Sequence, residues 1–108
     1  MSEERFQELN DLSVLYSVAE SKRRHLHEFR KSKKAILMKE YEKTNPKSSG
    51  KAQEREAYAH PEYLELLEGL KYATEEALLV KYKMDIIQMR FDAWRSKEST
   101  RRAEIGLR

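Results

Sequence analysis

Residues 63–94 read YLELLEGLKYATEEALLVKYKMDIIQMRFDAW, and this stretch decides the fold. Ten apolar residues recur in it at alternating spacings of three and four, which is the pattern of a coiled-coil seam. They are Tyr63, Leu66, Leu70, Ala73, Ala77, Val80, Met84, Ile87, Phe91 and Trp94. A stripe of this length predicts a long helix that packs against another helix.

The same stretch carries a second apolar row, offset from the seam by two residues. It consists of Leu79, Tyr82, Ile86, Met89 and Ala93. At about 100° per residue, this row lies nearly opposite the seam. A helix that is apolar on two opposed sides must be covered on both, and a chain of 108 residues with 38% charged residues has little left to cover it. We therefore predict that the protein is a homo-oligomer and that the second row is its interface.

The remaining composition predicts an all-α protein. Three glycines and two prolines allow few turns, and no alternating run of β-branched residues suggests a sheet. We predict one domain, 1–108, with the fold of a long antiparallel helical hairpin of coiled-coil type. Its two long helices span 2–44 and 61–104, and a short connecting helix spans 50–59.

Local signals set these bounds. Pro46 ends the first helix, because proline disfavours helical backbone in the residue before it. Ser48 or Ser49 suits the N-cap of the short helix, and Pro61 suits the first position of the last helix. Gly69 lies inside that helix at a cost of roughly 1 kcal/mol relative to alanine, which predicts a bend or a close approach of helices.

The first helix has a matching but interrupted apolar face. Its predicted inner residues are Leu12, Leu15, Ala19, Lys22, Leu26, Phe29, Lys33 and Ile36, widened by Val14, Val18 and Leu37. A turn between 44 and 61 predicts that residue i of this helix lies near residue 105 minus i of the last. The acidic start of the chain would then lie beside its basic end. The predicted ion-pair partners are Glu3, Glu4, Glu8 and Asp11 with Arg95, Lys97, Arg101 and Arg102.

The sequence contains no catalytic or metal-binding constellation. There is no cysteine, and His25, His27 and His60 lack the spacing that gathers three ligands on one face. We expect no enzyme activity, no catalytic residue, no metal and no cofactor. The acidic start lacks the apolar region of a signal peptide, and charges within 81–92 argue against a membrane span. We therefore expect a cytoplasmic protein without a membrane partner.

Charge is distributed unevenly along the chain. The net charge of +3 comprises −4 over 1–20, +6 over 21–44, +1 over 45–60, −4 over 61–80 and +4 over 81–108. The bases of the first positive zone, which we call the first basic block, are Lys22, Arg23, Arg24, Arg30, Lys31, Lys33 and Lys34. Such a stripe suits a phosphate backbone. A solvated basic face opposite Glu75 and Glu76 explains it equally well.

The second positive zone combines bases with aromatic rings. Its predicted nucleic-acid contacts are Arg95, Lys97, Arg101 and Arg102. Phe91 and Trp94 interleave with this zone, and rings among bases can stack on unpaired nucleobases. Because both rings belong to the seam, core packing is the favoured role for both.

Several short motifs together give the chain a resemblance to the UvsY-like family of T4-type phage recombination mediators. They are Tyr16-Ser17, the basic run through Lys34, the turn at 48–50, Glu54-Arg55-Glu56-Ala57-Tyr58-Ala59 with Pro61-Glu62-Tyr63, and Asp92-Ala93-Trp94-Arg95-Ser96-Lys97-Glu98-Ser99-Thr100-Arg101-Arg102. The resemblance implies a phage protein in the cytoplasm of a bacterial host.

The resemblance also implies a function. Such a mediator binds single-stranded DNA, displaces single-strand-binding protein and loads a RecA-like recombinase, without hydrolysing nucleotides. Its DNA contacts would be the first basic block, especially Arg30, Lys31, Lys33 and Lys34, and the terminal bases. The alternative is a phage-encoded helical protein-interaction module, an inhibitor or a scaffold, that binds no DNA.

Overall fold

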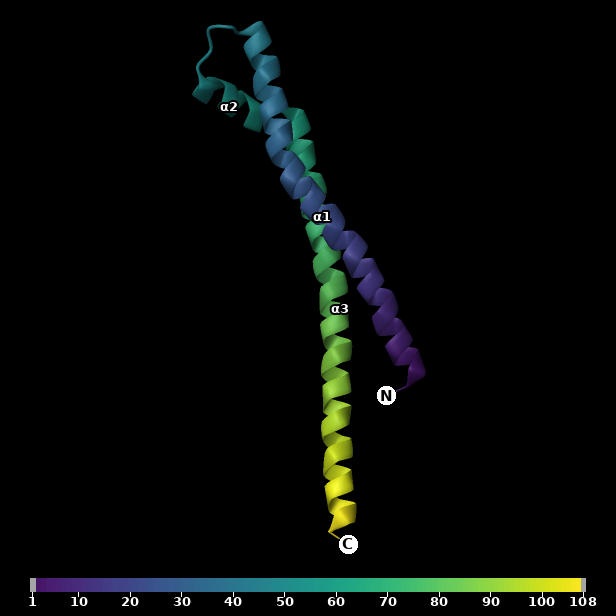
Figure 1. The fold of residues 1–108 in the computed structure, drawn as a ribbon. Helices are drawn as coiled ribbons and strands as arrows, with labels where there is room; N and C mark the ends of the chain where they lie inside the picture. Colours follow the sequence, from purple (N-terminus) through teal and green to yellow (C-terminus); the bar gives the residue numbers. More distant parts are fainter. Residues whose placement is uncertain (1, 108) are drawn as a thin grey trace. The chain divides into compact units, whose positions relative to one another are not determined.

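The computed structural model describes residues 2–107, and these form three α-helices (Figure 1). Helix α1 spans Glu3–Thr44, α2 spans Gly50–Ala59 and α3 spans Pro61–Gly106. No strand occurs within 2–107, so the all-α prediction is confirmed. The three helices begin and end within two residues of their predicted bounds.

Local hydrogen bonds fix the junctions between the helices. The Ser49 hydroxyl accepts a hydrogen bond from the N–H of Ala52 at 3.1 Å, which caps α2. Helix α2 ends where His60 adopts extended backbone. Nδ1 of His60 then accepts from the N–H of Glu62 at 3.0 Å. Pro61 is the first residue of α3, where its missing N–H leaves no hydrogen bond unmade.

Contacts divide the chain into two compact units. The connector unit comprises Ala19–Glu76, and the end unit comprises Met1–Val18 with Ala77–Arg108. Both long helices run through both units, so each unit contains one segment of α1 and one of α3, and the connector unit also contains α2.

The core of the connector unit lies where its three helices meet. Leu37 of α1, Ala57 of α2 and Tyr63 of α3 are buried together, and Met38 packs against them. Ala19 and Ala73 are also buried. Because alanine has a short side chain, these positions leave room for the helix backbones to approach one another.

The register of α1 against α3 differs from the prediction. In the connector unit, Lys33 Nζ lies 2.8 Å from Oε2 of Glu62. In the end unit, the rings of Phe6 and Phe91 meet edge to face, with centroids 5.4 Å apart. The prediction pairs residues whose numbers add to 105, but the numbers of these two pairs add to 95 and 97. Each residue of α1 therefore lies opposite a residue of α3 that is eight to ten positions earlier than predicted, which is roughly two and a half helical turns.

Helix α2 causes this shift. It packs back along the last turns of α1, as the ion pair of Lys34 with Glu54 at 3.3 Å and the contact of Leu37 with Ala57 show. Helix α3 therefore begins opposite Lys33 instead of opposite the end of α1.

The predicted ion pairs between the acidic start and the basic end of the chain are accordingly wrong. Within residues 2–107, Glu8 pairs with Arg5 at 2.9 Å and Arg101 pairs with Glu98 at 2.9 Å. Both are pairs within a single helix, spaced i,i+3. No ion pair in the described part of the chain joins an acid of α1 to a base beyond residue 94.

The inner face of α1 is also corrected. Half of the predicted stripe is exposed, namely Leu15, Lys22, Phe29 and Ile36. In each case the following residue takes the inward position: Tyr16, Arg23 and Arg30 are half-buried, and Leu37, which was expected to widen the face, is buried. A spacing of three or four residues permits either the predicted residue or the one after it to face inward. The half-buried arginines fit there because their side-chain stems are aliphatic.

The seam of α3 faces inward as predicted from Tyr63 to Phe91, where every member is buried or half-buried. Gly69 does not mark a close helix approach, since a methyl group added there meets nothing within 4 Å. Trp94 departs from the prediction, because 44% of its surface is exposed. Phe91 is the last seam residue with an aromatic contact on α1, and α1 itself begins only three residues before Phe6.

Candidate nucleic-acid interface

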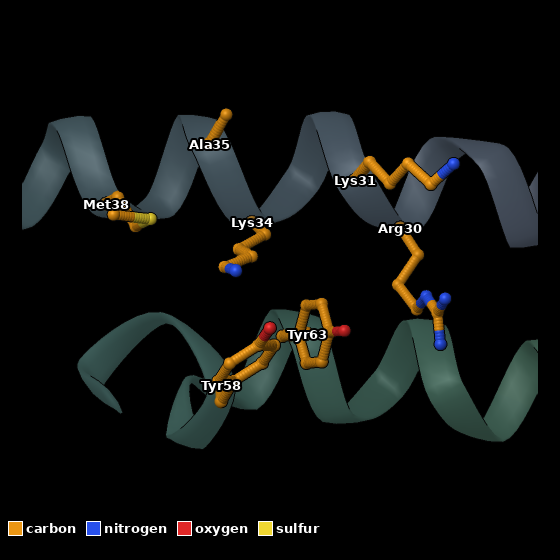
Figure 2. A pocket seen from close by; sticks show the side chains of 7 residues that line it. All are labelled: Arg30, Lys31, Lys34, Ala35, Met38, Tyr58 and Tyr63. Carbon is orange, nitrogen blue, oxygen red and sulfur yellow. The ribbon is translucent and has the colours of Figure 1, made fainter. Parts of the chain in front are cut away.

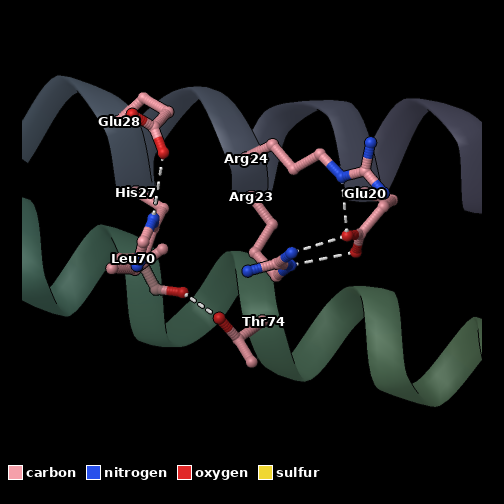
Figure 3. Close-up of polar contacts among 7 residues, drawn as sticks. All are labelled: Glu20, Arg23, Arg24, His27, Glu28, Leu70 and Thr74. Atoms are coloured by element: carbon pink, nitrogen blue, oxygen red, sulfur yellow. Dashed lines mark hydrogen bonds and ion pairs between the residues drawn. The ribbon is translucent and has the colours of Figure 1, made fainter.

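Most bases of the first basic block already have acidic partners. Arg23 and Arg24 contact Glu20 at 2.6 and 3.2 Å (Figure 3). Lys31 contacts Glu28 at 3.3 Å. Lys33 and Lys34 pair with acids of α3 and α2, as described above. The acids Glu75 and Glu76, expected opposite this block, make none of these pairs.

The basic side chains keep the carboxylates that they contact ionised. The hydrogen bond from Arg23 is the main cause that lowers the pKa of Glu20 from 4.5 to about 2; burial opposes it, and the hydrogen bond from Arg24 adds a weaker lowering effect. The hydrogen bond from Lys31 lowers the pKa of Glu28, and that from Lys33 lowers the pKa of Glu62. At neutral pH these acids therefore offset much of the positive charge of the block.

Two bases of the block have no acidic partner within residues 2–107. Lys22 is exposed, and Arg30 is half-buried. Arg30 lies at a surface pocket of about 500 Å³ in the connector unit, shown in Figure 2. The pocket is lined by Arg30, Lys31, Lys34, Ala35, Met38, Tyr58 and Tyr63, which include no carboxylate.

The aromatic wall of this pocket is held in place by one of its own bases. Lys34 Nζ lies 4.7 Å from the centroid of the Tyr58 ring, and the rings of Tyr58 and Tyr63 meet edge to face at 5.3 Å. The contact with Tyr58 raises the pKa of Lys34, more strongly than the one with Glu54. Lys34 thus has a structural role, and Arg30 is the base that this pocket offers to a ligand.

The end unit presents a second surface hollow, of about 400 Å³, which we call the Trp94 hollow. It is lined by Phe91, Trp94, Arg95, Glu98, Ser99 and Arg102. The rings of Phe91 and Trp94 stack at an interplanar angle of 19° with centroids 6.1 Å apart. The guanidinium carbon of Arg95 lies 5.9 Å from the Phe91 centroid. The indole of Trp94 is 44% exposed and lies in one hollow with the guanidinium groups of Arg95 and Arg102.

Only two of the four predicted nucleic-acid contacts near the end of the chain line this hollow. Arg95 and Arg102 line it, whereas Arg101 is held by Glu98 and Lys97 does not line it. The hydrogen bond with Glu98 raises the pKa of Arg101, and the same bond lowers the pKa of Glu98. The prediction that assigned Trp94 to the core missed this exposed ring, although the spacing of aromatics among bases had pointed to it.

Comparison with known protein families, curated proteins and solved structures gave no match. Within residues 2–107, no three histidine or acidic side chains come together in a way that would hold a metal ion. None of the three helices, over the same residues, is long and apolar enough to cross a membrane. The two surface hollows offer aromatic rings, guanidinium groups and lysines, which suit stacking and phosphate contact.

Proposed function

We propose that this protein binds single-stranded DNA through the Trp94 hollow. The observation that carries the proposal is the exposed Trp94 ring, stacked on Phe91 and flanked by Arg95 and Arg102. An unpaired nucleobase can stack on the open face of the indole, and the two guanidinium groups can contact the neighbouring phosphates. Stacking of this kind is worth about 1–3 kcal/mol per base and needs no particular sequence.

The first basic block offers fewer basic side chains to DNA than its composition suggests. Lys22 and Arg30 are its available bases, while Lys33 and Lys34 stabilise the packing of the connector unit. We propose that these bases add non-specific phosphate contacts, which makes the affinity depend on salt.

In cellular terms we propose an accessory role in recombination. The protein would bind single-stranded DNA coated with single-strand-binding protein and help a RecA-like recombinase to load there, in the cytoplasm of a bacterial host. The support for this role is the resemblance of the motifs to UvsY-like phage mediators. The role needs no catalysis, and the protein would act by binding alone.

The first experiment is a titration of the purified protein with oligothymidylate at low salt, followed by the intrinsic fluorescence of Trp94. This is the only tryptophan in the chain, so the signal reports directly on the hollow. We expect single-stranded DNA to quench the fluorescence. Duplex DNA of the same length should quench it less, because its bases are already stacked.

Variants then separate stacking from charge. Trp94→Ala should weaken binding in fluorescence anisotropy by about 1–3 kcal/mol, which is roughly 5- to 150-fold. Arg95→Ala with Arg102→Ala should lower the slope of log affinity against log salt by roughly 0.7 for each phosphate that the protein no longer neutralises. The matched control, Lys39→Ala with Lys43→Ala, removes two exposed charges far from the hollow in sequence and should have the smaller effect. Helical protein that binds no single strand at low salt would refute the proposal.

A second candidate function is a helical protein-interaction module that does not bind DNA. It is favoured by the ion pairs that occupy five of the seven bases of the first basic block. Paired charges of this kind stabilise a fold without serving a ligand. This candidate would be supported if the protein bound neither oligothymidylate nor duplex DNA yet co-purified stoichiometrically with one defined host protein.

A further inference from the structure

The second apolar row of α3 is exposed to solvent in the end unit. Leu79, Tyr82, Ile86 and Met89 are 58, 57, 45 and 62% exposed, and Ala93 is exposed as well. The same unit, over its described residues, buries only Ala77 and Ile87. A surface helix normally exposes its polar face, so an apolar row with heptad spacing on the outside indicates a missing partner helix.

Charged residues flank this row on both sides in a regular order. With Leu79 and Ile86 at heptad position a, and Tyr82 and Met89 at d, the acids Asp85 and Asp92 lie at g. The bases Arg90 and Lys97 lie at e. All four flanking residues are exposed, and none has an ion-pair partner in the described part of the chain. Asp92 accepts one hydrogen bond, from Gln88 at 3.2 Å.

The order of these charges distinguishes between partner orientations. In a parallel coiled coil, position g of one helix faces the e position five residues later on the other. Asp85 then faces Arg90 of a second copy, and Asp92 faces its Lys97. The preceding g–e pair, Leu78 with Lys83, adds no repulsion. In an antiparallel arrangement g faces g and e faces e, so acids would meet acids and bases would meet bases.

We propose that a second copy of this chain packs along this row in parallel and in register, with Leu79, Tyr82, Ile86 and Met89 facing their counterparts. The flanking pairs of opposite charge set the orientation. The surface is distinct from the Trp94 hollow, and self-association on it requires no DNA.

Mass measured by light scattering without DNA tests the surface itself. We expect at least twice the 12.9 kDa of one chain for the unaltered protein, and a single-chain mass for Leu79→Glu with Ile86→Glu. The matched control is Leu64→Glu with Leu67→Glu, which places the same charges on exposed leucines of the connector unit. This control should keep the mass of the unaltered protein. A protein that is monomeric at every concentration, or a row variant with unchanged mass, would overturn the proposal.

A single-cysteine variant tests the orientation without depending on a disruptive substitution. Ser96 occupies the next d position after Met89, and the chain has no cysteine of its own. In a parallel, in-register pair the two copies of this position face each other closely enough for a disulfide. Ser96→Cys should therefore form a covalent dimer on mild oxidation. Gln88→Cys, exposed outside the row, is the control. Equal cross-linking of the two variants would exclude the parallel register.

Charge reversal tests the flanking pairs. Asp85→Lys with Asp92→Lys leaves bases on both flanks, and Arg90→Glu with Lys97→Glu leaves acids on both flanks. Each double variant alone should have a lower mass than the unaltered protein, and mixing the two should restore the mass. If each double variant keeps its full mass, the flanking charges do not set the orientation and this part of the proposal fails.

Discussion

Lys33 of α1 and Glu62 of α3 form an ion pair of 2.8 Å, and this contact marks where the third helix begins to run beside the first. Lys33 belongs to the first basic block, for which DNA contact is one of two interpretations of the sequence, yet its ammonium group pairs with a carboxylate of the same chain. The register of the helices therefore decides how many basic side chains of the block remain free to contact a ligand, because it brings Glu62 beside Lys33.

A charge exchange tests this register. Lys33→Glu should lower the melting temperature because it places two carboxylates together, and adding Glu62→Lys should recover part of the loss. Full recovery is not expected, since a lysine in the first turn of α3 opposes the helix dipole. Circular dichroism melts provide the measurement. Lys22→Glu, at an exposed and unpaired position, should change the melting temperature less than Lys33→Glu does. Loss of equal size in both would contradict the assigned register.

Neighbouring residues on α1 test which of its faces is inside. Leu37, which widens the predicted inner face, is only 2% exposed, whereas Ile36 of the predicted stripe is 46% exposed. Leu37→Ala should lower the free energy of unfolding by about 2–5 kcal/mol because it empties the core beside Ala57 and Tyr63. Ile36→Ala should cost less than half as much. Urea denaturation at one fixed protein concentration compares the two, and a reversed order would restore the predicted face.

The cap of α2 is testable through Ser49. Ser49→Ala removes the acceptor of the Ala52 N–H and should lower the free energy of unfolding by about 1 kcal/mol. Ser49→Asp supplies another good acceptor at the same position and should retain most of the stability. Equal losses in both variants, measured by urea denaturation, would show that the hydroxyl has no capping role.

Gly69 offers a substitution that should stabilise the protein. It lies inside α3, and a methyl group there meets no atom within 4 Å. Gly69→Ala should raise the free energy of unfolding by roughly 1 kcal/mol, because alanine loses less backbone entropy in a helix. A destabilised variant in urea denaturation would mean that another helix approaches this position closely.

The acid side of the stability profile should depend on Glu20. Its pKa is lowered to about 2 in the folded chain by the hydrogen bond from Arg23 and the weaker one from Arg24. A lowered pKa means that this acid stabilises the fold fully above about pH 4.5 and that the contribution disappears as the pH falls towards 2. The melting temperatures of the unaltered protein and Glu20→Gln should therefore differ at pH 7 and converge near pH 2. A difference that stays constant over this range would contradict the assignment.

Much of the helical architecture was predictable from local signals. The seam from Tyr63 to Phe91 and the short connecting helix follow from apolar periodicity and from serine and proline at the helix starts. These signals act over a few residues, so they appear directly in the sequence. The candidate site was predicted in part. Arg95 and Arg102 were named for it, while Trp94 was assigned to the core.

The sequence by itself determined which segments are helical, which face of α3 is apolar, and that α3 has a second apolar row. Only the tertiary structure decided the partner of each face. Leu15 and Tyr16 both satisfy the helical spacing, and the choice between them depends on the packing of α1 against its partner helices, as does the choice of Leu37 over Ile36. The packing of α2 along α1 shifted the register of α3 by roughly two and a half turns. Lys33 therefore pairs with Glu62, and Trp94 follows Phe91, the last seam residue with an aromatic contact on α1. Contacts between residues far apart in the sequence depend on where the chain turns back. No local pattern in this sequence encodes how far α2 packs back along α1 before α3 begins.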